Sequence, residues 1–208
     1  TSMVNVAKLL LDSLDVSLLP LNILERSMGS ESSAIFELLA TAMSDGQLQE
    51  SLAAKPLLSR ACATHKWKAA EILIDRLPEA LAECNARGEA PIHRMWRPPP
   101  VPLWQKMVEG TPEDVLLLHT GKHFDTILHE AVRYFCAKHV AVLLAHLPHS
   151  ARQLRNLSGV TALDLATARA SGELPCAQRR GMEDFIPDGA VIVQMLSAGS
   201  VTKAAGQQ

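Results

Sequence analysis

A short apolar motif recurs along the chain at nearly constant spacing, and this recurrence restricts the possible folds more than any other feature. Its anchors are Leu58, Ile92, Leu128 and Leu163, which are separated by 34, 36 and 35 residues. A second apolar stretch with helical periodicity follows the motif in most copies. Two short helices per unit cannot bury their apolar faces alone, so the sequence predicts a row of stacked helical pairs.

The residues around these anchors resemble the ankyrin-repeat family. Its inner helix opens with Thr-Pro-Leu-His. Residues 126–129 (Thr-Ile-Leu-His) match it in three of four places, and residues 90–93 (Ala-Pro-Ile-His) match in two, with Ile in place of Leu. Residues 161–164 match in two. The resemblance covers residues 18–199. It implies an all-α ankyrin-repeat solenoid of about five helix–turn–helix units, with degenerate capping ends.

The phase of the motif divides the chain. We expect an N-terminal capping helix over residues 1–17, an ankyrin-repeat array over 18–199 and a frayed tail over 200–208. The units of the array are expected at 18–50, 51–84, 85–119, 120–154 and 155–199.

Local chemistry supports the helix starts and the loops. Thr126 and Thr161 precede helices and offer hydroxyl groups to the free backbone N–H groups. Pro91 suits a first helical turn, where its missing N–H is not needed. Gly88 and Gly159 permit the positive φ of a tight loop. We therefore expect a finger-like loop before each of these inner helices.

Two segments depart from the repeat. Three consecutive prolines, Pro98–Pro100, cannot continue a helix, so the inner helix before them is predicted to stop near Trp96. We expect Trp96 to pack in the core, with exposure in a groove as the alternative. Residues 171–188 are predicted to be an insertion before the last outer helix, which is expected to start near residue 190.

Composition excludes several classes of protein. The net charge is −2 and 48% of the residues are hydrophobic, which excludes a disordered chain and argues against a nucleic-acid or membrane-surface binder. The four cysteines, Cys62, Cys84, Cys136 and Cys176, are widely dispersed. They are interpreted as reduced, buried residues of a protein in the cytoplasm, or in the host cytosol if the chain is secreted.

We predict no catalytic, cofactor or metal site. His93 and His129 belong to the repeat motif, where the family resemblance implies bonds to neighbouring loop backbone. His119 and His123 have the i, i+4 spacing of a metal pair, but no nearby carboxylate or cysteine completes a ligand set. Nucleophile and phosphate-loop motifs do not occur in the sequence. The proline run at 98–102 is interpreted as a rigid loop, with an SH3-type ligand as the alternative.

The resemblance implies a protein-binding module that recognises its partner through a concave face of fingers and inner helices. By phase, with two residues of the insertion, the predicted partner-binding residues are Lys55, Arg87, Glu89, Arg97, His123, Asp125, Arg133, Tyr134, Arg169, Arg180 and Phe185. Tyr and Arg are common at the centres of protein interfaces. We expect a monomer.

Two other functions stay open. The chain also resembles, in architecture only, the ankyrin module of the type III-secreted arginine ADP-riboxanases, which implies a targeting domain of a larger effector enzyme that engages host caspases. Nucleic-acid binding through the arginines after residue 150 is the third class. Residues 120–208 hold nine Lys and Arg against seven Asp and Glu, and a net charge of +2 is too small to support it.

Overall fold

The computed structural model describes residues 3–13, 23–28, 33–54, 56–174 and 186–198. Most of these residues are helical, and the only bridges among them are two isolated pairs, Thr120–Asp125 and Arg155–Thr161. The predicted all-α class is therefore confirmed. The chain divides into two compact units, residues 1–95 and 96–208, where the sequence predicted one continuous array.

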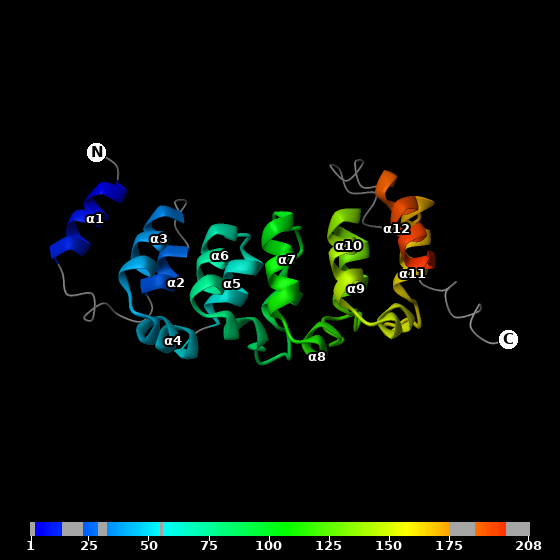
Figure 1. Ribbon diagram of the computed structural model, residues 1–208, viewed down its shortest axis with the longest axis horizontal. Coiled ribbons are helices and arrows are strands. Elements are labelled where there is room, and N and C mark those ends of the chain that lie inside the picture. The colour runs from blue at the N-terminus through cyan, green and yellow to red at the C-terminus, as the bar shows by residue number, and fades with distance from the viewer. Residues whose placement is uncertain (1–2, 14–22, 29–32, 55, 175–185, 199–208) are drawn as a thin grey trace. The chain divides into compact units, whose positions relative to one another are not determined.

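The first unit is built from helix pairs. Its elements are α1 (Met3–Ser13), α2 (Ile23–Met28), α3 (Ser33–Ala42), α4 (Asp45–Ala54), α5 (Leu57–Ala63), α6 (Trp67–Arg76) and the 3-10 turns η2 (Pro78–Ala82) and η3 (Pro91–Arg94). Helices α2, α5 and η3 contact in one row, and α3 and α6 contact in a second row that covers it (Figure 1). The apolar faces of both rows meet between them, with Leu24, Phe36, Leu58 and Leu73 almost fully buried.

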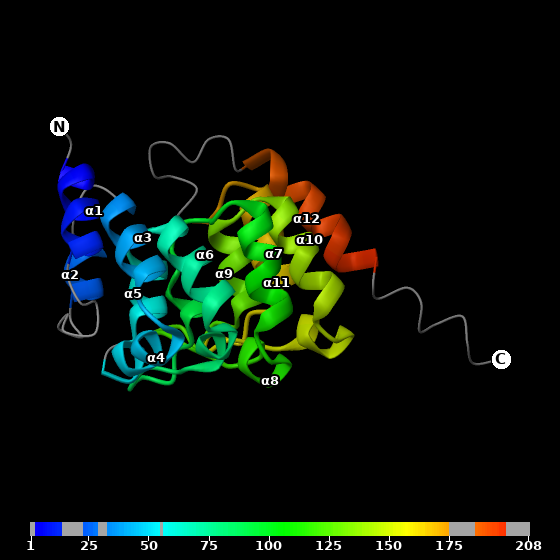
Figure 2. The same cartoon turned by 60° about the vertical axis from the view of Figure 1, so that its left-hand side comes forward.

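The second unit repeats this two-row arrangement. Its elements are α7 (Val101–Gly110), α8 (Glu113–Leu116), α9 (Ile127–Tyr134), α10 (Ala137–His146), the 3-10 turn η4 (His149–Gln153), α11 (Ala162–Ala170) and α12 (Ile186–Ala198). Helices α7, α10 and α12 form one row, and α9 and α11 form the other (Figure 2). We call α2, α5, η3, α9 and α11 the inner helices, and their partners the outer helices.

Helix ends follow the predicted chemistry. The Thr126 and Thr161 side chains take part in capping boxes with the third helical residue of α9 and α11. Pro91 stands in the first turn of η3, and η3 ends at Arg94 before the proline run, as predicted. Gly88 and Gly159 have φ of 73° and 72°. These predictions are confirmed.

Other predicted boundaries differ. Helix α4 runs across the boundary expected between residues 50 and 51. Helix α12 begins at Ile186, so residues 186–188 are its first turn rather than the end of an insertion. The Asp188 carboxylate accepts a hydrogen bond from the Ala137 backbone N–H at 3.2 Å, which ties this turn to the start of α10. A Cβ on Gly189 would meet the Ala170 backbone at 2.8 Å, so glycine permits the close contact of α12 with α11.

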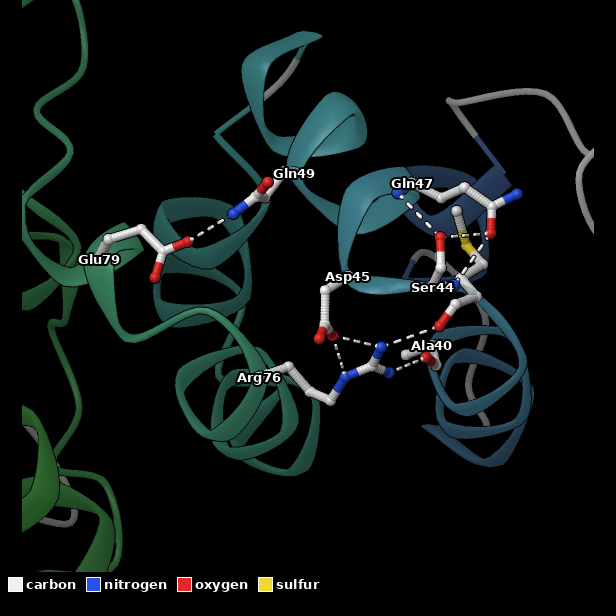
Figure 3. Close-up of polar contacts among 8 residues, drawn as sticks. Ala40, Ser44, Asp45, Gln47, Gln49, Arg76 and Glu79 are labelled. Carbon is white, nitrogen blue, oxygen red and sulfur yellow. Dashed lines mark hydrogen bonds and ion pairs between the residues drawn. The ribbon is translucent and has the colours of Figure 1, made fainter.

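Arginine side chains close the ends of helices in both units. In the first unit the Arg76 guanidinium donates to the carbonyl oxygens of Ala40 and Met43 at 2.6 and 2.9 Å and to Asp45 Oδ1 at 2.7 Å (Figure 3). These carbonyls lie in the last turn of α3 and just after it, where no helical N–H is available to bond them. The arginine therefore fastens outer helix α6 to outer helix α3 and to α4.

Candidate interaction surface

Two loops before inner helices have the same hydrogen bonds. In the first unit the Asn85 side-chain oxygen accepts from the backbone N–H groups of Arg87 and Glu89. In the second unit the Asn156 oxygen accepts in the same way from Ser158 and Val160. In each loop the glycine three residues after the asparagine, Gly88 or Gly159, donates its backbone N–H to the asparagine carbonyl oxygen at 2.9 Å. The asparagine thus rigidifies both loops and presents the residues at their tips.

Asp125 is a buried connector rather than an accessible contact residue. Its side chain is 0% exposed. One carboxylate oxygen accepts from Arg133 Nε at 2.9 Å and the other from Asn156 Nδ2 at 2.7 Å. The prediction of Asp125 on the surface is therefore wrong, because its charge joins the 120–125 loop to α9 and to the next loop.

Two more predicted contact residues are buried. The whole of Arg169 is 2% exposed, and its guanidinium donates to the carbonyl oxygens of Val132 and Phe135 at 2.7 Å each. Glu89 is buried and accepts from Asn85 and Arg94 at 2.9 Å. Burial tends to raise the pKa of Glu89, but these hydrogen bonds and the nearby arginine charges outweigh it and lower the pKa. Both side chains hold the fold together instead of facing a partner.

The remaining predicted residues differ in accessibility. Arg87, Arg97 and His123 are exposed, and Arg133 and Tyr134 are half-buried on α9. Lys55, Arg180 and Phe185 lie outside the described residues.

Exposed apolar side chains at loop tips are what the sequence interpretation missed. Phe124 is 54% exposed and has φ of 50°, a left-handed conformation that is strained for a bulky residue. Leu157 is 71% exposed, and its backbone N–H donates to the His123 carbonyl at 3.0 Å, so the two loop tips are adjacent. The available signal was an apolar residue between polar neighbours within a predicted loop, where burial offers no reason for it.

The position of Trp96 also differs from the prediction. It is 56% exposed rather than packed in the core, and the Arg97 guanidinium carbon lies 4.6 Å from the centre of its ring. The proline run turns the chain immediately after the short η3 turn, so no helix carries Trp96 inward. The buried tryptophan of the second unit is Trp104, which packs edge-on against Phe135.

The pairing of Cys136 and His139 was not predicted. The Cys136 Sγ and His139 Nδ1 atoms are 3.0 Å apart, and His139 Nε2 lies 2.8 Å from the Pro99 carbonyl oxygen. Burial lowers the pKa of His139, and the bond to Pro99 offsets this only in part. The pair fastens α10 to the proline loop.

The other cysteines differ from one another. Cys62 is buried, and burial raises the pKa of its thiol to about 12. Cys84 is exposed, contrary to the prediction of buried cysteines. Cys176 lies outside the described residues.

The two repeat histidines differ in their hydrogen bonds. His129 Nε2 lies 3.0 Å from the Val160 carbonyl oxygen of the following loop, which confirms its predicted structural role. His93 differs: both of its ring nitrogens are buried without a hydrogen-bond partner in the described part of the chain. Burial lowers the pKa of His93 to about 4, so this ring is neutral near pH 7.

No group of three or more His, Cys, Asp or Glu side chains among the described residues is arranged to hold a metal ion. None of the described helices has the length and apolar character needed to cross a bilayer. No protein-family model matches the chain, and no curated protein is significantly similar to it. The resemblances to ankyrin repeats and to the effector enzymes therefore stay predictions.

Proposed function

We propose that the chain is a protein-binding module of the ankyrin type, and that the adjacent loop tips at Phe124 and Leu157 form a contact surface for its partner. The observation that carries the proposal is a pair of exposed apolar side chains held on rigid loops. A phenylalanine in a left-handed conformation costs free energy, and such strain is retained where the surrounding structure requires a side chain to be presented.

Rigid presentation favours binding. Asn156 fixes one loop through two backbone bonds, and the Thr120–Asp125 bridge closes the other with bonds of 2.9 and 3.1 Å. Ordered loops lose little conformational freedom when a partner docks, so more of the contact energy contributes to affinity. Exposed aromatic and large aliphatic side chains are the usual anchors of such interfaces.

The ankyrin assignment rests on repeated local structure. Matching asparagine loops precede η3 and α11, capping boxes open α9 and α11, and each unit has an inner and an outer row. In that arrangement the loops and inner helices share one side of a helix stack. Exposed His123 and half-buried Tyr134 and Arg133 would then extend the surface from the loop tips to α9.

Site-specific photocrosslinking tests the proposal. We would place p-benzoylphenylalanine at Leu157, and as a matched control at Val191, an exposed apolar residue on outer helix α12. After irradiation in native or host cell lysate, we expect a discrete crosslinked protein from position 157 and none from 191. The substitution Phe124→Ser should abolish that crosslink. Equal crosslinking at both positions, or none at 157, would reject the loop tips as the contact surface.

A further inference from the structure

The first unit contains a cavity that the predicted binding face does not include. It has a volume of about 340 Å³ and lies along the inner helices α2, α5 and η3. The side chains that define its chemistry are Glu25, Leu57, Ser59, Arg60, Ala63 and Arg94. The lining combines apolar side chains with two guanidinium groups. A ligand must therefore combine a short apolar stem with a polar head.

Some of the polar groups around the cavity have hydrogen-bond partners, and others have none among the described residues. Glu25 already accepts a hydrogen bond from Arg60, and Arg94 Nη1 donates to Glu89 at 2.9 Å. Each arginine therefore uses one nitrogen on a carboxylate, and its other nitrogens have no acceptor among the described residues. The Ser59 hydroxyl is likewise unpartnered there, in a residue that is only 6% exposed.

We propose that this cavity binds the carboxylate of a glutamate side chain from a partner protein. Arg60 and Arg94 each engage a carboxylate, Glu25 and Glu89, through one nitrogen, so an incoming carboxylate can accept from the nitrogens that remain. Arginine forks match carboxylate geometry and form charge-assisted hydrogen bonds. Leu57 and Ala63 offer apolar contacts for the two methylene groups of the ligand, and the carboxylate supplies an acceptor to Ser59.

Other ligand heads fit the lining less well. A lysine or arginine would face two guanidinium groups and find Glu25 already engaged. A neutral amide offers these nitrogens an uncharged acceptor, which forms weaker hydrogen bonds to a guanidinium than a carboxylate does. The inference extends the proposed protein-binding role to the first unit. It stands on residues separate from Phe124 and Leu157, so either proposal can fail without the other.

A titration followed by 15N NMR of the full chain tests the ligand class. The probe is the peptide Ac-Ala-Glu-Ala-NH2, with the Gln, Lys and phosphoserine peptides as comparators. We expect saturable shifts at the Ser59 amide and at the Arg60 and Arg94 Nε–Hε signals, with a dissociation constant of roughly 1–10 mM for so small a ligand. The Gln and Lys peptides should bind about ten-fold more weakly or not at all.

Several results would overturn the assignment. Equal binding of the Glu and Gln peptides would remove the role of charge. Tighter binding of the phosphoserine peptide would make the cavity a phosphate site. Chemical shifts that do not saturate as the peptide concentration rises would indicate that the cavity binds no peptide specifically. Because these probes do not involve the loop tips, failure here leaves the crosslinking result at Leu157 unaffected, and the reverse also holds.

Variants give effects of opposite sign. Arg60→Gln and Arg94→Gln should each lower the affinity for the Glu peptide about five-fold or more, because each removes a guanidinium donor group. Glu25→Gln should raise the affinity for the Glu peptide about three-fold, because the substitution releases Arg60 and removes a competing negative charge. The matched control is Arg26→Gln, an exposed charge next to Glu25 that does not line the cavity, and it should change the affinity by less than about two-fold. Thermal melting of each variant checks folding, and weaker binding by folded Glu25→Gln would overturn the proposal.

Discussion

The two units place a histidine at the same point of the repeat motif and use it differently. In the second unit His129 completes a capping box with Thr126 and reaches the Val160 carbonyl oxygen of the next loop at 3.0 Å. In the first unit His93 follows Ala90, which has no hydroxyl group, and its buried ring nitrogens find no partner in the described residues. A matching motif therefore fixes the position of a side chain but not its hydrogen bonds, which depend on the residues around it.

The arginines that close helix ends show the same contrast. Arg76 in the first unit is partly exposed and shares its guanidinium between two carbonyls and Asp45. Arg169 in the second unit is buried and bonds the Val132 and Phe135 carbonyls. Arg169 thus makes its bonds out of water, where the loss of one partner has a larger cost.

The largest expected effect comes from removing the buried arginine. Arg169→Met should lower the free energy of unfolding by about 4 kcal/mol, because two buried carbonyls lose a charged donor. Arg76→Met should cost only about 1–2 kcal/mol, because water reaches its partners. Urea unfolding followed by circular dichroism measures both. Similar losses for the two variants would break the contrast between the units.

The unpartnered histidine should make the first unit sensitive to acid. Burial lowers the folded-state pKa of His93 to about 4, below the usual value of 6.5, so the unfolded chain binds the proton more readily. Stability linked to this ring is complete above pH 6.5 and is lost as the pH falls toward 4, by at most about 3 kcal/mol. His93→Leu should flatten the unfolding free energy over that range. An unchanged pH profile in the variant would show that water reaches the ring.

A half-buried carboxyl in the second unit should act in the opposite direction. Burial, and then the charge of Asp125, raise the pKa of Glu130 from 4.5 to about 7, with Arg133 opposing. Stability linked to a raised carboxyl pKa is present below pH 4.5 and is lost as the pH rises through 7. Glu130→Gln should therefore stabilise the chain by about 2 kcal/mol at pH 8 and by little at pH 4.5. Thermal melts of the variant and the original chain at the two pH values measure this difference. Equal stabilisation at both pH values would reject the raised pKa of Glu130.

The histidine comparison itself can be tested at neutral pH. His129→Leu should cost about 1–2 kcal/mol, because it breaks the capping box and removes one of the two hydrogen bonds to the Val160 carbonyl oxygen, which keeps its bond from the Asn156 backbone N–H. His93→Leu should be neutral or slightly stabilising, because an apolar side chain replaces a buried polar ring without partners. Chemical unfolding of the two variants at pH 7 checks this. A loss from His93→Leu as large as that from His129→Leu would mean that the first ring has a partner after all.

Periodic features of the fold were predictable from the sequence, and accessibility was not. The spacing of Leu58, Ile92, Leu128 and Leu163 located helix pairs, because apolar period and burial are directly linked. The phase of the repeat placed Arg169 on an exposed face. It could not show that a long side chain would fold back to cap another helix.

The accessibility of the loop residues was not predictable for a related reason. Asp125 was expected outside because loop residues usually are, yet its carboxylate joins two structural elements that are far apart in the sequence. The exposure of Phe124 and Leu157 follows from the turn geometry on either side of them, which a helical period does not report. The cavity at Arg60 and Arg94 depends on the meeting of three helices and has no signature in any one segment.

The smallest expected change in stability occurs at the strained loop tip, where it should separate stability from binding. Phe124 has φ of 50° and is more than half exposed, so its side chain contributes little packing to offset its conformational cost. Asparagine adopts this conformation readily, so Phe124→Asn should raise the free energy of unfolding by up to about 1 kcal/mol. The same change removes the aromatic anchor and should abolish crosslinking from position 157. A variant that is more stable but no longer binds would assign the strain to function, because folding alone gains nothing from it. If Phe124→Asn were instead less stable and still crosslinked, the aromatic ring would serve the fold and the contact surface would have to lie elsewhere.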